Sequence, residues 1–142
     1  MLIRVTLHGM EGGPPVELVD AKPALWVGHV VLATHDLTTA FAFYRDLGLR
    51  AVHEARATDA IAELELRGGT HLVLVLDAGA RIDGRAAPFD LMADDLDALR
   101  EAMDRRGIEV SAIERGPHAS FTFRDADGWT VTVNDSHVVG RV

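Results

Sequence analysis

The sequence predicts an α+β fold in which two tandem strand–helix–three-strand (βαβββ) modules form a curved mixed sheet around a cleft, with the helices on its convex face. Two observations support this prediction. One constant offset carries Val30 onto Phe89 and Gly48 onto Gly107, so the chain contains an internal repeat. In each copy, the apolar residues follow a strand spacing, then a helix spacing, and then strand spacings again.

The beginning of the chain is expected to lie outside this repeat. Residues 2–7 alternate as in a short strand, and the run Gly12-Gly-Pro-Pro15 then interrupts any regular element. The expected organisation is an N-terminal arm, a single domain made of module one, a linker and module two, and a C-terminal tail. These parts span residues 1–25, 26–135 (26–77, 78–86 and 87–135) and 136–142.

Each module begins with a β-rich segment, at 26–34 and 89–93, and continues with a helix. Asp36 and the pair Asp94-Asp95 are placed to cap the helices, because an acidic side chain at the N-terminus accepts a free backbone N–H. The apolar stripes at helical spacing are Leu37, Ala40, Phe41, Tyr44 and Leu47, and then Leu96, Leu99 and Met103.

Three strands follow each helix. Gly48 and Gly107 stand where a helix ends in a left-handed residue, and each precedes an apolar residue. Turn-forming residues then separate short β-rich segments. The expected strands are 49–55, 60–66 and 71–76, and then 108–114, 119–124 and 129–135.

The composition excludes several classes of function. The formal net charge is −8 and Lys22 is the only lysine, so the chain lacks the basic surface that a nucleic-acid partner requires. There is no cysteine, which removes disulfides, thiolate nucleophiles and zinc–thiolate sites. Because no apolar run reaches the ~20 residues of a membrane span, and the start lacks a signal-peptide pattern, we expect a cytoplasmic protein without a membrane partner.

Several common motifs of catalytic sites are also missing. The chain has no phosphate-binding glycine loop, no His-Glu-x-x-His and no Gly-x-Ser-x-Gly. The sequence therefore assigns no catalytic residue.

Two segments resemble a known family. One is His29-Val-Val-Leu-Ala-Thr-His-Asp-Leu, followed by Phe41-x-x-Tyr44-x-x-Leu47-Gly48-Leu49, and the other is Phe123-x-Asp125-x-Asp127-Gly128-Trp129. Over roughly residues 26–135 the chain resembles the glyoxalase/bleomycin-resistance/dioxygenase (vicinal oxygen chelate) proteins. The resemblance implies the repeated βαβββ fold, a small-molecule ligand, and a homodimer whose ligand clefts are shaped by both chains.

The resemblance also implies where a metal would bind. Metal-dependent members take one ligand from the first strand and one from the last strand of each module. Carried over by position, these ligands fall on His29, Val73 (or Leu74), Pro88 and Thr132. Only the first is a usual metal ligand, and a transition-metal site needs three or four protein donors. We therefore expect neither the family's usual metal site nor another cofactor.

Strand alternation predicts which side chains line the cleft. One face should be apolar and cover the helices, with Ala62, Leu64, Leu66, Ala119, Phe121, Phe123, Val131 and Val133. The opposite face then carries His29, Glu63, Glu65, His71, Asp90, Ser120, Thr122, Arg124, Thr130 and Thr132. This second set suits a solvated concave surface that binds a polar ligand.

The candidate ligand-binding residues come mainly from the polar face: His29, Asp90, Glu65, Thr132, Arg124, His71 and Thr122, with Trp129 added. Asp90 is the most informative, because a carboxylate inside an apolar strand costs free energy unless it has a partner. Four of the others also have a simpler interpretation. His29 is also expected as an ordinary hydrogen-bonded histidine, Glu65 and Arg124 as an ion pair on a solvated face, and Trp129 as a residue of the core.

The leading hypothesis is a metal-free small-molecule-binding protein, similar to the drug-sequestering members of the group. The alternative is a divalent-metal-dependent lyase, isomerase or dioxygenase-like enzyme with a rearranged ligand set. That set would contain His29 and His71, with Glu65 or Asp90 as a further ligand or general base. A scaffold without a ligand is the third possibility.

Overall fold

The computed structural model describes residues 5–7, 16–18, 22–54, 56 and 58–140. Its contacts divide the chain into a large unit, Val27–His137, and a small unit formed by Met1–Trp26 and Val138–Val142. The small unit contains the antiparallel strands β1 (Val5–Leu7) and β2 (Val16–Leu18). The expected strand over 2–7 is thus described only in its second half, and the expected break at 12–15 lies outside the described residues.

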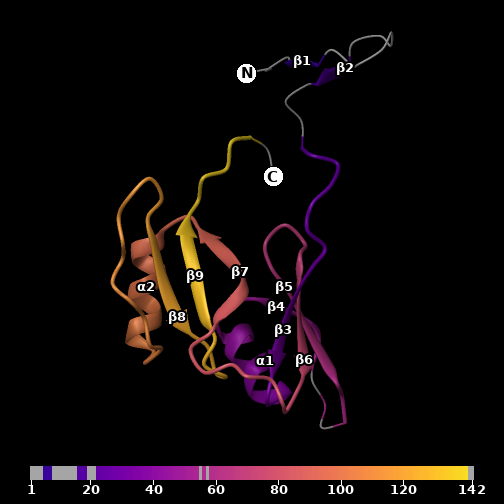
Figure 1. Ribbon diagram of the computed structural model, residues 1–142, viewed down its shortest axis with the longest axis vertical. Coiled ribbons are helices and arrows are strands. Elements are labelled where there is room, and N and C mark those ends of the chain that lie inside the picture. The colour runs from indigo at the N-terminus through magenta and orange to yellow at the C-terminus, as the bar shows by residue number, and fades with distance from the viewer. Residues whose placement is uncertain (1–4, 8–15, 19–21, 55, 57, 141–142) are drawn as a thin grey trace. The chain divides into compact units, whose positions relative to one another are not determined.

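Module one contains one helix and a four-stranded sheet (Figure 1). Its elements are β3 (His29–Thr34), α1 (Leu37–Asp46), β4 (Arg50–His53), β5 (Ile61–Glu65) and β6 (His71–Leu76). The sheet has the order β3-β6-β5-β4, with β3 parallel to β6 and the other pairs antiparallel. The helix between β3 and β4 makes the parallel pairing possible, since parallel strands need a long crossover.

Module two repeats this arrangement with one strand fewer. Its elements are β7 (Ala86–Ala93), α2 (Leu96–Arg105), β8 (Ser120–Arg124) and β9 (Thr130–Asp135). The sheet has the order β7-β9-β8, with β7 parallel to β9. Pro88 has no amide hydrogen, and the β7–β9 pairing shifts register between Ala86 and Asp90, on either side of it.

The strand expected over 108–114 is replaced by two isolated bridges, Val110 with Phe123 and Glu114 with Ser120. The hydroxyl of Ser111 explains the interruption. It accepts the backbone N–H of Thr122 at 2.8 Å and so takes the place of a ladder carbonyl. That prediction of a regular strand is therefore wrong, although the segment still lies along β8.

The helix caps confirm the sequence prediction. Asp36 accepts the N–H of Thr39 at 3.1 Å, and Asp95 accepts the N–H of Ala98 at 3.0 Å. The hydrogen bond from Thr39 lowers the pKa of Asp36. Gly48 (φ 109°) and Gly107 (φ 79°) follow the two helices in the left-handed region that glycine tolerates best.

One hydrophobic core runs through both modules. Most of the predicted apolar face is buried: Ala62, Leu64, Phe121, Phe123, Val131 and Val133 are at most 1% exposed, while Leu66 and Ala119 are partly buried. Between the modules, the ring of Phe43 in α1 stacks on that of Phe123 in β8, with centroids 6.1 Å apart. In the part of the chain that the structure describes, no helix has the length and apolar character to span a membrane.

Candidate functional site

A row of four polar side chains crosses the whole sheet of module one. The strand registers place His29 beside His71, His71 beside Glu65, and Glu65 beside Arg50, one residue from each strand. We call these four residues the four-strand row. All four point away from the apolar face, because alternate residues of a strand lie on opposite sides. The predicted polar face of module one is therefore present, and it brings three separate sequence segments together.

His71 is the centre of this row. Its Nδ1 lies 3.6 Å from Oε2 of Glu63, and its Nε2 lies 3.4 Å from Oε1 of Glu65. Arg50 Nη1 donates to Oε2 of Glu65 at 2.9 Å. The ring of His29 meets that of His71 edge to face, with centroids 5.8 Å apart. The imidazole of His71 is thus held between two carboxylates, and among the described side chains only that of Glu65 has an arginine partner.

The side chains of this centre are accessible to a ligand. His71, Glu63 and Glu65 each expose about a quarter of the side chain (25–26%). A half-buried carboxylate offers hydrogen-bond acceptors in a medium less polar than bulk water, where such bonds are stronger. The arrangement can therefore accept hydrogen bonds from the donor groups or the cationic group of a small molecule.

Module two presents a second polar row. Asp90 lies beside Thr132, and Thr132 lies beside Thr122, in the registers of β7, β9 and β8. Nδ2 of Asn134 donates to Oδ2 of Asp90 at 3.3 Å. Three predicted ligand-binding residues are thus neighbours. The carboxylate of Asp90, which was expected to need a partner inside an apolar strand, is exposed and accepts a hydrogen bond from an amide.

The other predicted site residues, Arg124 and Trp129, lie against other parts of the protein itself. Arg124 is exposed, and its guanidinium lies beside Gly84, where a built Cβ would be 3.1 Å from Nη2. Glu65 pairs with Arg50 and His71, so the expected ion pair between Glu65 and Arg124 is replaced by contacts within module one. Trp129 packs against the core and its Nε1 donates to the carbonyl of Ala33 at 2.8 Å, as in the simpler of its two readings.

Arg50 was missed by the sequence reasoning. Its signal is weak, since it is simply the first residue of a strand that follows a helix-ending glycine. Only the antiparallel pairing of β4 with β5 brings it opposite Glu65.

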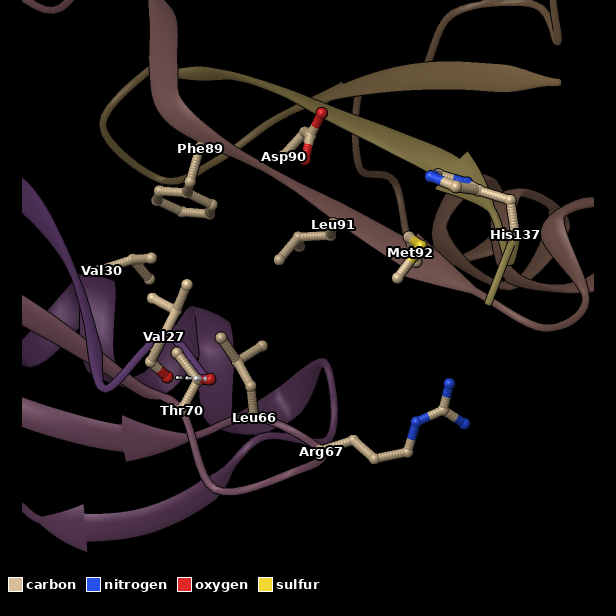
Figure 2. Close-up of a pocket in the computed structure, with 10 residues that line it drawn as sticks. All are labelled: Val27, Val30, Leu66, Arg67, Thr70, Phe89, Asp90, Leu91, Met92 and His137. Atoms are coloured by element: carbon tan, nitrogen blue, oxygen red, sulfur yellow. Dashed lines mark hydrogen bonds between the residues drawn. The ribbon is translucent and has the colours of Figure 1, made fainter. Parts of the chain in front are cut away.

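An open pocket of about 570 Å³ lies within the large unit, between β7 and the β3 and β5–β6 side of module one (Figure 2). Its apolar lining residues are Val27, Val30, Leu66, Phe89, Leu91 and Met92, and its polar ones are Arg67, Thr70, Asp90 and His137. Asp90 thus belongs both to the polar row of module two and to this pocket. Arg67 also pairs with Asp94 at 2.7 Å, which connects the β5–β6 turn to the start of α2. The wall of the pocket is mainly apolar, because Phe89 and Leu91 point into it while the carboxylate of Asp90 points to the other side of β7 (Figure 2).

The buried titratable groups near the β8–β9 turn hold the modules together. Oη of Tyr44 donates to Oδ2 of Asp125 at 2.7 Å, and Oγ1 of Thr34 donates to Oδ2 of Asp127 at 2.6 Å. Burial raises the pKa of Asp125, and hydrogen bonds from Tyr44 and from the backbone of Trp129 oppose that shift. Burial also raises the pKa of Tyr44, with the charge of Asp125 adding to the effect. These shifts have a structural cause and need no ligand.

The comparisons with known proteins agree on the fold. A family model described as Glyoxalase/Bleomycin resistance protein/Dioxygenase superfamily matches residues 26–133. Among solved structures, a member of that superfamily from Sphaerobacter thermophilus DSM 20745 is similar with a TM-score of 0.67 and 21% identity, over 79% of this chain and 98% of that one.

Two further structures carry names of different enzymes. Lactoylglutathione lyase from Agrobacterium tumefaciens has a TM-score of 0.64 and 26% identity, over 82% of this chain and 96% of that one. The oxidase ChaP-H2 has a TM-score of 0.60 and 18% identity, over 83% and 98%. No curated protein matches the sequence. The same fold thus accompanies a lyase name and an oxidase name, so the chemistry must be argued from the residues of this chain.

Proposed function

Because the chain belongs to the glyoxalase/bleomycin resistance protein/dioxygenase superfamily, we propose that it is a small-molecule-binding protein that works without the family's usual metal site. The four-strand row is the observation that carries this proposal. His71 and Glu65 are partly exposed, hydrogen-bonding side chains on the polar face of the module-one sheet. Such a face supplies the few convergent polar groups that orient a bound small molecule.

The residues at the usual metal positions do not fit a metal. Val73 and Pro88 have no side-chain donor atom, and Thr132 offers only a neutral hydroxyl. In the β3–β6 register, the neighbour of His29 is His71 and not Val73. The two ring nitrogens of His71 each face a different carboxylate, so His71 is already engaged in the protein's own contacts. The donor set suits hydrogen bonding to an organic ligand better than the family's metal quartet.

The chemistry of the four-strand row suggests a ligand with hydrogen-bond donors. The row offers carboxylate acceptors from Glu63 and Glu65 around one imidazole. Amine, amide or hydroxyl groups of a small molecule would satisfy these acceptors. The apolar pocket is a separate surface, because Val30, which lines it, lies on the opposite side of β3 from His29.

A second copy of the chain is proposed to complete the site. Val31 is 53% exposed and belongs to the same strand face as His29, and Met92 is 47% exposed and belongs to the same face as Asp90. Exposed apolar side chains next to polar rows are typical of a surface that another molecule covers. A homodimer would bring such faces of two chains together around the ligand.

The dimer is tested by light scattering coupled to size-exclusion chromatography. The wild-type protein should elute with the mass of two chains. Val31→Lys should shift the mass toward one chain, since a charge in a closely packed interface costs free energy. Thr38→Lys, on the exposed side of α1, is the control and should leave the mass unchanged. A monomeric wild-type protein would refute this part of the proposal.

Ligand binding is tested by a thermal-shift screen with aromatic, glycopeptide and thiol-conjugate compounds, because a ligand that binds the folded state raises Tm. A hit should lose most of its shift in Glu65→Gln and in His71→Gln. Glu101→Gln and His35→Gln make the same chemical changes at exposed positions away from the row and should keep it. The absence of any hit, or equal losses in the control variants, would contradict the proposal.

The alternative is a metal-dependent lyase, isomerase or dioxygenase-like enzyme. The observation that favours it is the pairing of His29 with His71, with Glu65 next in the row. It predicts about one equivalent of Ni, Zn, Mn or Fe(II) per chain, and loss of that metal in both His29→Ala and His71→Ala. The binding-protein proposal predicts that these two variants leave the metal content unchanged.

A further inference from the structure

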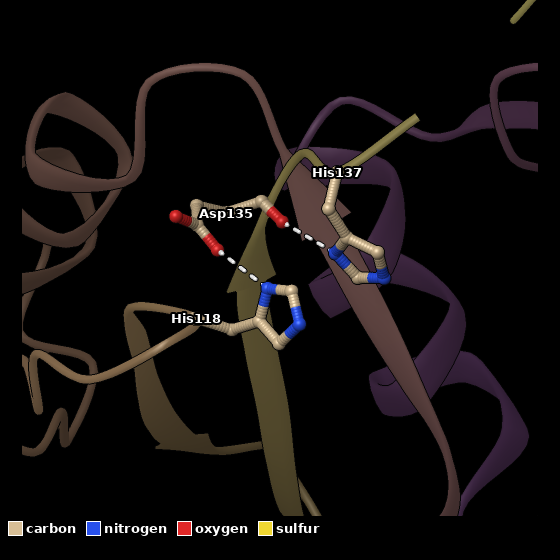
Figure 3. A group of neighbouring side chains, drawn as sticks. All are labelled: His118, Asp135 and His137. Atoms are coloured by element: carbon tan, nitrogen blue, oxygen red, sulfur yellow. Dashed lines mark hydrogen bonds and ion pairs between the residues drawn. The ribbon is translucent and has the colours of Figure 1, made fainter. Parts of the chain in front are cut away.

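Three side chains at the carboxyl end of β9 form a cluster that the proposed function does not use: His118, Asp135 and His137 (Figure 3). One donor atom from each lies within 4.8 Å of the others. The two imidazole rings have centroids 4.5 Å apart. Nδ1 of His118 lies 4.0 Å from Oδ1 of Asp135.

The carboxylate of Asp135 has an unsatisfied oxygen. Its Oδ1 is inaccessible to solvent and has no hydrogen-bond partner, and the imidazole of His118 is too far away to supply one. A buried polar atom without a partner costs about 1 to 3 kcal/mol. Among the described side chains of this chain that are not exposed, it is the one buried atom in this state. A cation bound between Asp135 and the two histidines would satisfy it.

The nitrogen of His137 that faces the cluster is Nδ1, which lies 3.1 Å from the backbone carbonyl oxygen of Asp135. A carbonyl can only accept, so Nδ1 carries the proton in this contact. Nε2 points away from Asp135 and His118 (Figure 3). Because the side chain is exposed, the ring can turn, and it must do so for either nitrogen to bind an ion shared with the other two residues.

We propose that His118, Asp135 and His137 bind a divalent transition-metal ion of the zinc class through two imidazoles and one carboxylate. This donor set is one that zinc accepts, and three protein ligands leave a position open for water or for a ligand atom. Ligands about 2 Å from a tetrahedral ion are about 3.3 Å from one another. The histidines expose much of their side chains and can close from 4.8 Å by rotation, while Asp135 stays fixed by β9.

The site differs from the proposed ligand face and from the family's metal positions. Asp135 lies on the same side of β9 as the buried residues Val131 and Val133, whereas Thr132 points to the polar side. The backbone N–H of Asp135 donates to Ala119 at 2.9 Å, so the hairpin itself holds His118 near the end of β9. His137 also lines the pocket of Figure 2, so a bound ion would fix one wall of that pocket.

The test is a zinc titration of the untagged protein, followed by a competing chromophoric chelator, with Tm measured in parallel. We expect about one equivalent of zinc and a raised Tm. The double variant His118→Gln/His137→Gln should bind zinc at least about 10-fold more weakly and lose the Tm shift. Asp135→Asn keeps the shape of the side chain and should also weaken binding.

The matched control is His29→Gln/His71→Gln, which also removes two histidines but on the polar face of module one. It should bind zinc as the wild type does. Unchanged circular dichroism of the His118→Gln/His137→Gln variant, whose two substituted residues are exposed, would show that it is folded. The proposal is overturned if the wild type binds no zinc, if that variant binds it normally, or if only the control loses it.

Discussion

The hydroxyl of Tyr44 donates a 2.7 Å hydrogen bond to the carboxylate of Asp125, between helix α1 of module one and the β8–β9 turn of module two. Tyr44 is 1% exposed and Asp125 is 7% exposed. The other carboxylate oxygen, Oδ1, accepts the backbone N–H groups of Asp127, Gly128 and Trp129. One side chain thus shapes the turn and joins the two modules.

Tyr44→Phe should destabilise the protein by about 1.5 to 3 kcal/mol at pH 7, because the variant leaves Oδ2 of Asp125 buried without its donor. Urea unfolding followed by circular dichroism measures this free energy. Phe41→Leu, which shortens a buried side chain of the same helix and removes no hydrogen bond, shows the cost of a packing change alone. A loss below about 0.5 kcal/mol for Tyr44→Phe, which is the range of neutral surface changes, would show that the bond contributes nothing.

The pH dependence of stability should change in Asp125→Asn. Burial raises the pKa of Asp125 in the folded state above 3.8, the ordinary value of an aspartate side chain. The folded state therefore holds this proton more tightly than the unfolded state. Its stabilising contribution is complete below pH 3.8 and is lost as the pH rises through the raised folded pKa.

Asparagine does not titrate, so the free energy of unfolding of the wild type minus that of Asp125→Asn should fall as the pH rises from 3.8. Unfolding by urea at a series of pH values measures this difference. Asp36 serves as the contrast, because a hydrogen bond from Thr39 lowers its pKa. Its contribution is present above pH 3.8 and is lost on acidification, so Asp36→Asn should give the opposite slope.

Both modules should unfold in one transition. Phe43 and Phe123 stack between them, and the core is continuous. Phe123→Ala should cost about 3 to 5 kcal/mol. In each protein, wild type and variant, tryptophan fluorescence and far-ultraviolet circular dichroism should agree on one unfolding midpoint. Two separate midpoints in the wild type would mean that the modules fold independently.

Gly84→Ala should destabilise the protein by about 1 to 2 kcal/mol, because Gly84 has φ +75° and alanine is strained there. The new Cβ would also lie 3.1 Å from Nη2 of Arg124, whose flexible side chain can move away. Gly79→Ala is the matched control, since Gly79 is outside the positive-φ region and its nearest atom, Oδ1 of Asp77, is 3.6 Å away. Thermal unfolding of both variants tests this prediction. Equal losses of Tm in Gly84→Ala and Gly79→Ala would contradict it.

Local regularities made much of the fold predictable. The alternation in 119–124 and 129–135 identifies the buried faces, because a strand exposes every second residue to the same side. Asp36 and Asp95 were predictable as caps, because a helix start needs a nearby acceptor. The prediction of a regular strand over 108–114 was wrong. The apolar alternation is present there, but the hydroxyl of Ser111 accepts a hydrogen bond in place of a backbone carbonyl of the ladder.

The sequence predicted which residues lie on the polar face, but it did not predict which of their side chains touch. Parity placed His29, Glu65 and His71 on one polar face together with Asp90, Thr122 and Thr132, whereas the structure divides these residues between two sheets. Their neighbours depend on register: a shift of one residue between β5 and β6 would separate His71 from Glu65. Arg50 entered the row only through this pairing.

The sequence by itself determined the repeated order of a strand, a helix and further strands, together with the caps and the buried faces, since each depends on residues close together in the chain. The tertiary structure alone decided that Tyr44 meets Asp125, that Glu65 pairs with Arg50, and that His118 and His137 lie beside Asp135. These contacts join segments distant in the chain, or side chains brought together by a hairpin. Their geometry follows from how sheets and helices pack, which no local spacing records.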